Sequence, residues 1–144
     1  MQRPWHGVCL LLFLALGIPG CGKRTGTTDP PAKIQLERLF EFYQAYAAKN
    51  KRPPPDEKAF KEFIRQLPKE ERDAAGVGND VDSFLVSPRD GQKFDIRYRL
   101  VIDVGGPTQA VAWEHTGKDG KRLVALSVGY VQEYSEEDFH ALKK

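Results

Sequence analysis

The longest periodic pattern in the chain is a stripe of apolar residues between positions 34 and 49. Its members recur three or four residues apart: Leu36, Leu39, Phe40, Tyr43, Tyr46 and Ala47. This spacing places them on one face of an α-helix, with polar and charged residues around much of the rest. Three prolines at 53–55 stop the helix, and Asn50 is expected in the left-handed position after its last turn. The pattern predicts an amphipathic helix over 34–49 with its aromatic side chains in the core.

A second, shorter apolar stripe follows Asp56, whose carboxylate can accept hydrogen bonds from the free amides of a first helical turn. Its apolar positions also recur at helical spacing: Phe60, Phe63, Ile64 and Leu67. Pro68 marks the end of this predicted helix. Residues 69–83 are polar, and we expect a fraying turn or short helix there, followed by a loop.

From residue 84 the period of the pattern changes to two. Residues 84–87 (FLVS) are a candidate short strand, closed by a stretch with the composition of a turn at 87–91 (SPRDG). Apolar residues then alternate with mostly polar ones over 93–104: Phe94, Ile96, Tyr98, Leu100, Ile102 and Val104. This alternation predicts a strand over 93–104 with one buried and one exposed face, as in antiparallel sheets.

Short strands are also predicted toward the C-terminus, at 110–114, 121–128 and 130–134. We expect Val111 and Trp113 on one face of the first of these. Residues 117–120 (GKDG) have the composition of a hairpin turn. The sequence therefore predicts a series of antiparallel strands joined by tight turns.

The chain ends with a predicted short helix. Ser135 is its expected N-cap, with Asp138 in the capping-box position. Because the long helices come first and the strands follow in hairpin order, the expected fold class is α+β. We expect an N-terminal amphipathic helix packed on a three- or four-stranded antiparallel sheet.

The N-terminus has a different character. Positions 8–18 (VCLLLFLALGI) form an unbroken run of low polarity that follows a short segment carrying Arg3. Eleven residues make about 16 Å of helix, roughly half the ~30 Å hydrocarbon core of a bilayer. The run is therefore too short for an ordinary transmembrane helix, and it is typical of the apolar core of a secretory signal peptide.

The four residues that end this run, Ile18-Pro19-Gly20-Cys21, resemble the lipobox of bacterial lipoproteins. The resemblance implies recognition of Ile18 and Gly20, cleavage before Cys21, and attachment of lipid to the thiol and new amine of Cys21. Gly22 is not acidic, which by the same resemblance favours the outer over the inner membrane. The alternative is an ordinary signal peptide cut at a small residue, with Cys21 incidental.

Three segments follow from this interpretation. Residues 1–20 are predicted to be a lipoprotein signal peptide, and 21–33 a lipidated cysteine with a flexible linker rich in Gly, Thr and Pro. Residues 34–144 are predicted to form a single α+β domain. The domain would lie outside the cytoplasm, attached to a membrane by lipid and facing the periplasm.

The order of elements over 34–142 resembles the soluble part of type IV pilin-like and pseudopilin-like proteins. The residues that carry the resemblance are clustered in turns and strand ends: 87–91 (SPRDG), 112–114 (AWE), 117–122 (GKDGKR), Val124, 129–131 (GYV) and 136–139 (EEDF). The resemblance implies a pilin-like fold and an exported setting, and no activity. Pilins polymerise through a long apolar helix; this chain has a lipobox and a polar linker instead, so that mode of assembly is not expected.

Composition narrows the function classes further. The chain has 144 residues and a formal net charge of +2, so it lacks the broad basic field of a nucleic-acid-binding protein. Two cysteines cannot build a disulfide scaffold. Apolar residues make up 40% of the chain, enough for a packed core.

Candidate chemistry is sparse. Glu114 and His115 are neighbours, but adjacent strand residues point to opposite faces, so we do not expect them to form a catalytic pair or a metal site. Asp80 and Asp82 could supply oxygen ligands for calcium, and the alternative is that they are solvated turn acids. Arg97 and Arg99, with Lys93 nearby, could form a basic stripe on the exposed sheet face that binds an anion or glycan. The alternative is that these cations pair with acids of the same face, Asp95 and Asp103.

No catalytic constellation is present, and no enzyme activity or cofactor is predicted. The expected function is that of a lipid-anchored extracytoplasmic module, non-enzymatic, acting through protein–protein contacts in the bacterial envelope. The alternative is an envelope ligand-binding lipoprotein or an enzyme whose site is built from loops.

Overall fold

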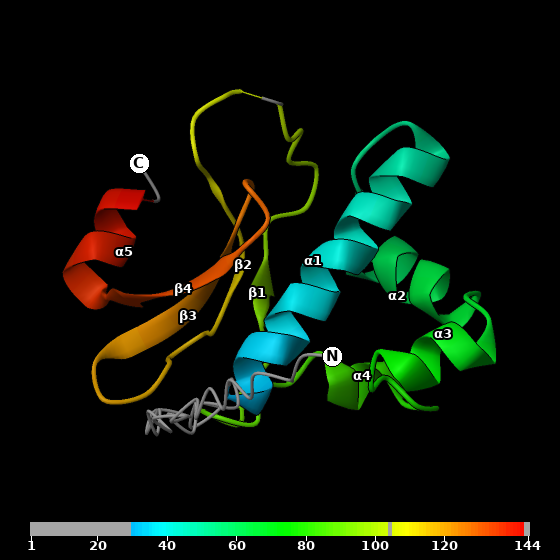
Figure 1. The fold of residues 1–144 in the computed structure, drawn as a ribbon, viewed down its shortest axis with the longest axis horizontal. Helices are drawn as coiled ribbons and strands as arrows, with labels where there is room; N and C mark the ends of the chain where they lie inside the picture. The colour runs from blue at the N-terminus through cyan, green and yellow to red at the C-terminus, as the bar shows by residue number, and fades with distance from the viewer. Residues whose placement is uncertain (1–29, 104, 143–144) are drawn as a thin grey trace, which may run out of the picture.

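The computed structural model describes residues 30–103 and 105–142 (Figure 1). It contains the helices and strands α1 (Pro31–Asn50), α2 (Glu57–Arg65), α3 (Lys69–Ala74), α4 (Val81–Phe84), β1 (Asp95–Ile96), β2 (Ala110–Trp113), β3 (Lys121–Leu126), β4 (Val131–Ser135) and α5 (Glu136–Leu142). The predicted signal peptide, its residues Ile18 and Gly20, and Cys21 lie outside the described residues. Within the described part, no helix is long and apolar enough to cross a membrane.

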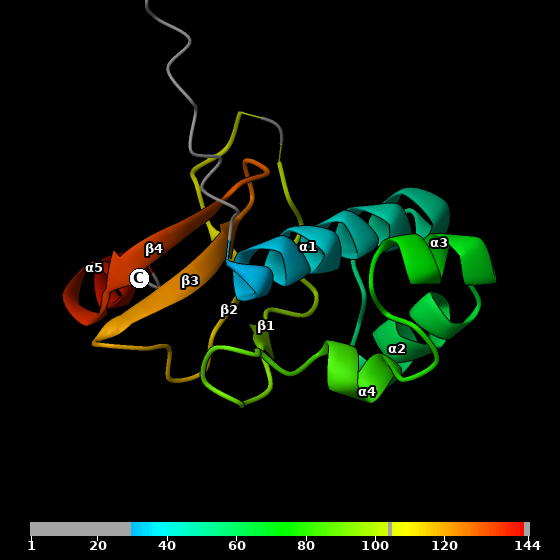
Figure 2. The same cartoon turned by 60° about the horizontal axis from the view of Figure 1, so that its bottom comes forward.

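The strands form one antiparallel sheet in the order β1-β2-β3-β4, so that each strand pairs with its neighbour in sequence. This confirms the α+β class and the antiparallel sheet. In Figures 1 and 2, α1 and α5 lie on opposite sides of the sheet. The molecule therefore has apolar side chains packed on both faces of β2 and β3.

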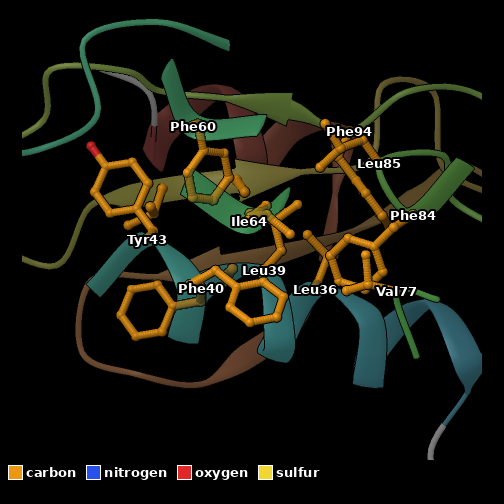
Figure 3. Close-up of a cluster of buried hydrophobic side chains, with 14 of the residues drawn as sticks. Leu36, Leu39, Phe40, Tyr43, Phe60, Ile64, Val77, Phe84, Leu85 and Phe94 are labelled. Carbon is orange, nitrogen blue, oxygen red and sulfur yellow. The ribbon is translucent and has the colours of Figure 1, made fainter. Parts of the chain in front are cut away.

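The larger buried cluster combines side chains of α1, α2 and α4 with residues of β2, β3 and β4 (Figure 3). Leu36, Leu39 and Tyr43 of the predicted stripe are fully buried in it. The ring of Phe60 from α2 packs edge-on against Tyr43, with centroids 6.1 Å apart. A smaller cluster beneath α5 is centred on Phe139 and Trp113.

Helix α1 is longer than predicted and ends one residue later. It begins at Pro31 rather than at 34, because proline is well suited to the first turn, where its missing N–H is not needed. At the other end Lys51, and not Asn50, adopts the left-handed conformation, with φ 56°. The side-chain amide of Asn50 instead donates to the carbonyl of Tyr46 at 3.0 Å.

The second helix and the last helix are confirmed together with their caps. The carboxylate of Asp56 accepts a hydrogen bond from the amide of Ala59 at 2.8 Å. Ser135 accepts from the amide of Asp138 at 3.2 Å and donates to its carboxylate at 2.7 Å. These caps are local interactions that need no distant partner.

The prediction of a strand over 84–87 is wrong. Val81–Phe84 forms the short helix α4, whose first amides are held by the side chain of Asp80. The apolar residues Val81 and Phe84 are buried by this turn of helix, which satisfies the same apolar pattern that a strand would. The strand-like pairing that the described residues show in this segment is an isolated antiparallel bridge between Val86 and Lys93.

The prediction of a long strand over 93–104 is also wrong, since β1 covers Asp95–Ile96 alone. Beyond β1 the backbone bends: Arg99 has a φ of 63°, and its amide donates to the carbonyl of Pro54 at 2.9 Å. The amide of Leu100 donates to the hydroxyl of Tyr43 at 3.1 Å. Phe94, Ile96, Tyr98, Leu100 and Ile102 still pack on the core, whereas Val104 lies outside the described residues. From Arg99 on, the backbone amides bond to a proline loop and to a side chain of α1 rather than to a strand.

Strand β2 corrects the expectation that Val111 and Trp113 share a face. The pairing with β3 shifts between Ala110 and Ala112, as in a β-bulge. Val111 therefore joins the cluster on the α1 side, whereas Trp113 joins the cluster beneath α5. Strand β3 ends at Leu126, two residues earlier than predicted.

Candidate functional site

The candidate site is a polar network that joins the 87–91 loop to the β2–β3 hairpin. Among the described residues, Ser87 and Glu114 are the polar residues that are buried, and both are fully inaccessible. The hydroxyl of Ser87 donates to one carboxylate oxygen of Glu114 at 2.8 Å, and the amide of Leu123 donates to the other at 2.9 Å. A buried carboxylate is tolerated only when it is hydrogen-bonded and paired in this way.

Arg89 supplies the opposite charge. One terminal nitrogen of its guanidinium lies 3.5 Å from the buried carboxylate of Glu114. The other donates to the carboxylate of Glu133 at 2.6 Å and to the carbonyls of Lys118 and Lys121, both at 3.3 Å. This one side chain therefore connects the 87–91 loop to the hairpin and to strand β4.

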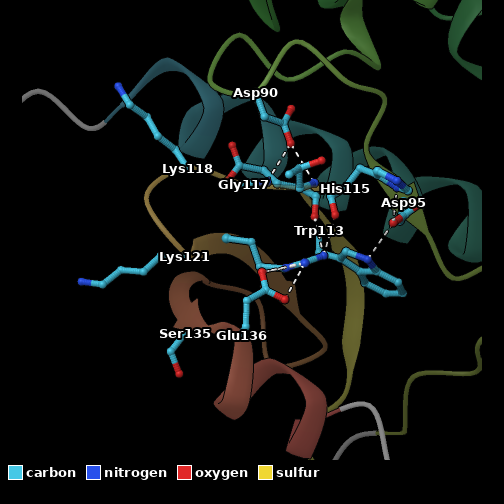
Figure 4. A network of polar contacts seen from close by, with 12 residues as sticks. Asp90, Asp95, Trp113, His115, Gly117, Lys118, Lys121, Ser135 and Glu136 are labelled. Atoms are coloured by element: carbon cyan, nitrogen blue, oxygen red, sulfur yellow. Dashed lines mark hydrogen bonds and ion pairs between the residues drawn. The ribbon is translucent and has the colours of Figure 1, made fainter.

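Asp90 fastens the same loop to the start of the hairpin (Figure 4). One of its oxygens accepts from the amides of Thr116 at 3.0 Å and Gly117 at 2.9 Å, and the other accepts from the amide of Gln92 at 3.0 Å. Burial raises the pKa of Asp90, but the hydrogen bonds from these amides outweigh it, so its pKa lies below the ordinary value. The carboxylate is therefore ionised and fully engaged in holding two loops together.

Gly117 is required by the close approach of chain segments at this point. Its φ is 74°, and a Cβ there would overlap the carbonyl oxygen of Lys121 and the Cα of Arg122. The turn that follows has Asp119 and Gly120 at φ 54° and 71°, the positive values of a tight hairpin turn. The predicted hairpin turn at 117–120 is thereby confirmed.

On the far side of the hairpin, Arg122 attaches α5 to the sheet. Its guanidinium binds both carboxylate oxygens of Glu136, at 2.6 and 2.7 Å, and lies over the ring of Phe139 at 4.4 Å. It also donates to the carbonyls of Glu114 and His115, at 3.2 and 2.6 Å. The network thus extends from the 87–91 loop through the hairpin to the C-terminal helix.

Glu114 and His115 diverge, as the strand geometry predicted. Glu114 is buried, whereas the imidazole of His115 is exposed and lies 3.1 Å from the carboxylate of Asp95. Asp95 also accepts from the indole of Trp113 at 3.0 Å (Figure 4). The acidic groups of the network accept hydrogen bonds from donors of the protein itself, so the arrangement holds separate segments of the chain together.

The two aspartates singled out for calcium have other partners. Asp80 caps α4, and hydrogen bonds from Ser83 and the amide of Asp82 hold its pKa below the ordinary value. Asp82 pairs with Lys61 at 2.6 Å and with Arg65 at 3.3 Å. Across the described residues, no group of three or more His, Cys, Asp or Glu side chains is placed to hold a metal ion. Calcium binding at Asp80 and Asp82 stays a prediction, and a cation there would have to displace these contacts.

The expected basic stripe is divided among separate partners. Lys93 pairs with Glu57 of α2 at 3.0 Å. Arg99 donates through its Nε to the carbonyl of Pro55 at 3.1 Å, which fastens the proline loop. Because the chain bends after β1, these cations do not follow one strand face.

Sequence reasoning missed the polar network as a unit. It placed residues 87–91 in a turn and Glu114 at a strand end, but it did not join them. The available signal was the position of Glu114 directly after an entirely apolar strand, where a charged side chain requires partners.

No known protein family, no curated protein and no solved structure matches the chain.

Proposed function

We propose that this chain is a lipid-anchored extracytoplasmic protein that acts without catalysis, through contacts with another protein of the bacterial envelope. The observation that carries the proposal is the Ile18-Pro19-Gly20-Cys21 sequence, whose first residue is the last of an eleven-residue apolar run. An acylated cysteine contributes about 0.8 kcal/mol of membrane affinity per buried CH₂, so several acyl chains make a durable anchor.

The domain we propose is pilin-like, with its amphipathic N-terminal helix packed on the sheet. The order of elements supports this: a long helix, a variable connection, and then four strands paired in sequence. Support for a non-catalytic role comes from the polar network, since Glu114, Asp90 and Arg122 each bind groups of the protein itself. Such a network stabilises a scaffold whose outer surface makes the functional contact.

Acylation is tested by growing expressing bacteria with radiolabelled palmitate and following label in the purified chain. We expect label in the wild type and none in Cys21→Ser. Cys9→Ser is the matched control, because Cys9 is the other cysteine of the chain and lies within the apolar run. Cys9→Ser should carry as much label as the wild type, and Cys9→Ser and the wild type should both fractionate with membranes.

Two results would overturn the proposed anchor. One is label that persists in Cys21→Ser, which would place the acyl group elsewhere. The other is a wild-type chain that carries no label and whose purified N-terminus is not Cys21.

A further inference from the structure

A groove of about 550 Å³ lies between the C-terminal part of α1 and the segment that follows β1. It is lined by Tyr43, Gln44, Ala47, Lys51, Arg52, Pro53, Leu100, Val101 and Ile102. Figure 3 shows Tyr43 at the edge of the buried cluster, with its hydroxyl directed away from the other labelled side chains. The groove is thus an apolar surface bordered by two cations and continuous with the core.

Both walls of the groove are held by specific hydrogen bonds. The hydroxyl of Tyr43 accepts from the amide of Leu100 at 3.1 Å and donates to the carbonyl of Arg97 at 3.0 Å. Arg99 holds the proline loop through its backbone amide and its side chain, to Pro54 and Pro55. The groove is therefore formed before any partner binds, which lowers the entropic cost of binding.

The exposed segment in the groove has unused bonding capacity. The side chain of Val101 is 60% exposed, the largest exposure among the large apolar residues of the described chain. In the same described part, the backbone amides of Val101 and Ile102 donate to no acceptor. Because successive amides of an extended segment point to opposite sides, an extended peptide laid beside this segment could accept from one of those amides and cover the side chain of Val101.

The charge at the rim indicates the sign of the partner. Neither Lys51 nor Arg52 forms an ion pair or a side-chain hydrogen bond with another residue in the described ranges. Their charges favour the negative end of the α1 dipole, which accounts for their presence but leaves their side chains available. A carboxylate brought into the groove would meet two cations that no acidic side chain of residues 30–103 or 105–142 neutralises.

We propose that this groove binds an extended, acidic and aliphatic segment of a partner protein. Aliphatic side chains of the segment would cover Val101, its backbone would pair with residues 101–102, and its carboxylates would meet Lys51 and Arg52. The inference rests on the proposed function and specifies the partner's chemistry. The groove lies toward the opposite end of α1 from Pro31, in a helix of 20 residues or about 30 Å. An exposed stretch of backbone beside two cations favours an acidic peptide over a lipid chain, which could not pair with that backbone.

The test uses the full chain in nanodiscs of zwitterionic lipid and a fluorescent, acetylated octapeptide of alternating glutamate and leucine. Fluorescence anisotropy at low ionic strength should show saturable binding that weakens as salt is added. The double variant Lys51→Gln/Arg52→Gln and the single variant Val101→Glu should each weaken binding by about tenfold or more. A peptide of alternating lysine and leucine should not bind.

Matched controls separate the groove from general surface effects. Lys58→Gln removes an exposed cation of α2, and Val128→Glu places a carboxylate at a residue that is 52% exposed on the turn after β3. Both should bind the acidic peptide as the wild type does. Circular dichroism should be unchanged in all four variants, because every substituted side chain is exposed. The unfolding midpoint should also be unchanged, except for a small decrease in Lys51→Gln/Arg52→Gln, which loses the interaction of two charges with the α1 dipole.

Several results would overturn the inference: no binding of the acidic peptide, equal binding of the basic peptide, or equal weakening in the control variants. If dodecanoate displaces the peptide, and the affinity for dodecanoate is the same in Lys51→Gln/Arg52→Gln as in the wild type, the groove is instead a site for apolar ligands. A self-associating chain whose groove residues are covered in the dimer would identify a second copy as the occupant. Peptide binding does not require acylation of the chain. Absence of peptide binding would therefore leave the proposed lipid anchor standing, and absence of palmitate label would leave the proposed peptide groove standing.

Discussion

Replacing Glu114 with alanine removes the centre of the buried polar network. The hydroxyl of Ser87 and the amide of Leu123 then lose their acceptor inside the protein, at positions that are almost inaccessible to water. Each unsatisfied buried donor costs about 1–3 kcal/mol, so the loss of the acceptor for two donors in Glu114→Ala should lower the free energy of unfolding by about 2–6 kcal/mol. Arg89 retains Glu133 and two carbonyls, which limits the loss on that side.

The assay is urea unfolding followed by circular dichroism, with the midpoint and the slope compared between variants. Glu133→Ala is the matched control, because Glu133 also binds Arg89 but its side chain is 41% exposed. An exposed ion pair contributes about 0–1 kcal/mol, so this variant should lie close to the wild type. The contrast between the two glutamates isolates the effect of burial.

A double-mutant cycle between Ser87→Ala and Glu114→Ala measures the contact between these two side chains, because each single variant removes one partner of the hydrogen bond. We expect a coupling energy of about 1 kcal/mol, the usual net value for one hydrogen bond. The reasoning is refuted if Glu114→Ala costs no more than Glu133→Ala, or if the cycle shows no coupling while both single variants remain folded.

Three further predictions concern neighbouring contacts. Gly117→Ala should destabilise the protein by about 2 kcal/mol or more, because the added Cβ would overlap the carbonyl oxygen of Lys121. Gly120→Ala has a similar φ but an open surrounding, so it should cost only about 1 kcal/mol, and equal losses of unfolding free energy in urea would contradict the prediction. The pKa of Asp90 lies below its ordinary value of 3.8, so the ionised carboxylate contributes stability above that pH and the contribution is lost as the pH falls through the folded-state pKa. Asp90→Asn should be less stable than the wild type at neutral pH and should lose less stability on acidification; a pH profile of stability like that of the wild type would count against this prediction. Burial raises the pKa of Tyr43 to about 12, although the hydrogen bond from the amide of Leu100 opposes this rise. The stability gained from the neutral phenol is therefore complete below its ordinary pKa of 10.0 and is lost as the pH rises toward about 12. In an ultraviolet titration Tyr43→Phe should show one late-ionising phenol fewer than the wild type, and loss of an early-ionising phenol instead would refute the assignment.

The polar network illustrates why a site can be missed even when each of its residues is visible in the sequence. Ser87 and Glu114 are 27 residues apart, and their contact depends on the exact path of the loop between them. The alternation after residue 93 predicted a continuous strand that would have carried the chain along the sheet. Instead the chain bends at Arg99 toward Pro54, and this bend also forms one wall of the proposed peptide groove.

Local patterns were sufficient for the features whose interactions are close in sequence. The helical turns of α1, the cap of α2 by Asp56, the tight turn at 117–120 and the cap of α5 by Ser135 form through contacts a few residues apart. One short window of the sequence therefore contains both partners of each contact. The α+β class followed from the order of these segments.

Long-range backbone partners were decided only by the folded chain. Residues 84–86 and 99–100 lie in apolar patterns compatible with strands. Their backbone amides bond instead to carbonyls in and beside α4, to Pro54 and to the hydroxyl of Tyr43. Period-two alternation determines which side chains reach the core, but a strand also needs a neighbouring strand whose free N–H and C=O groups lie in register. That condition depends on packing between distant segments, so no local window of the sequence contains it.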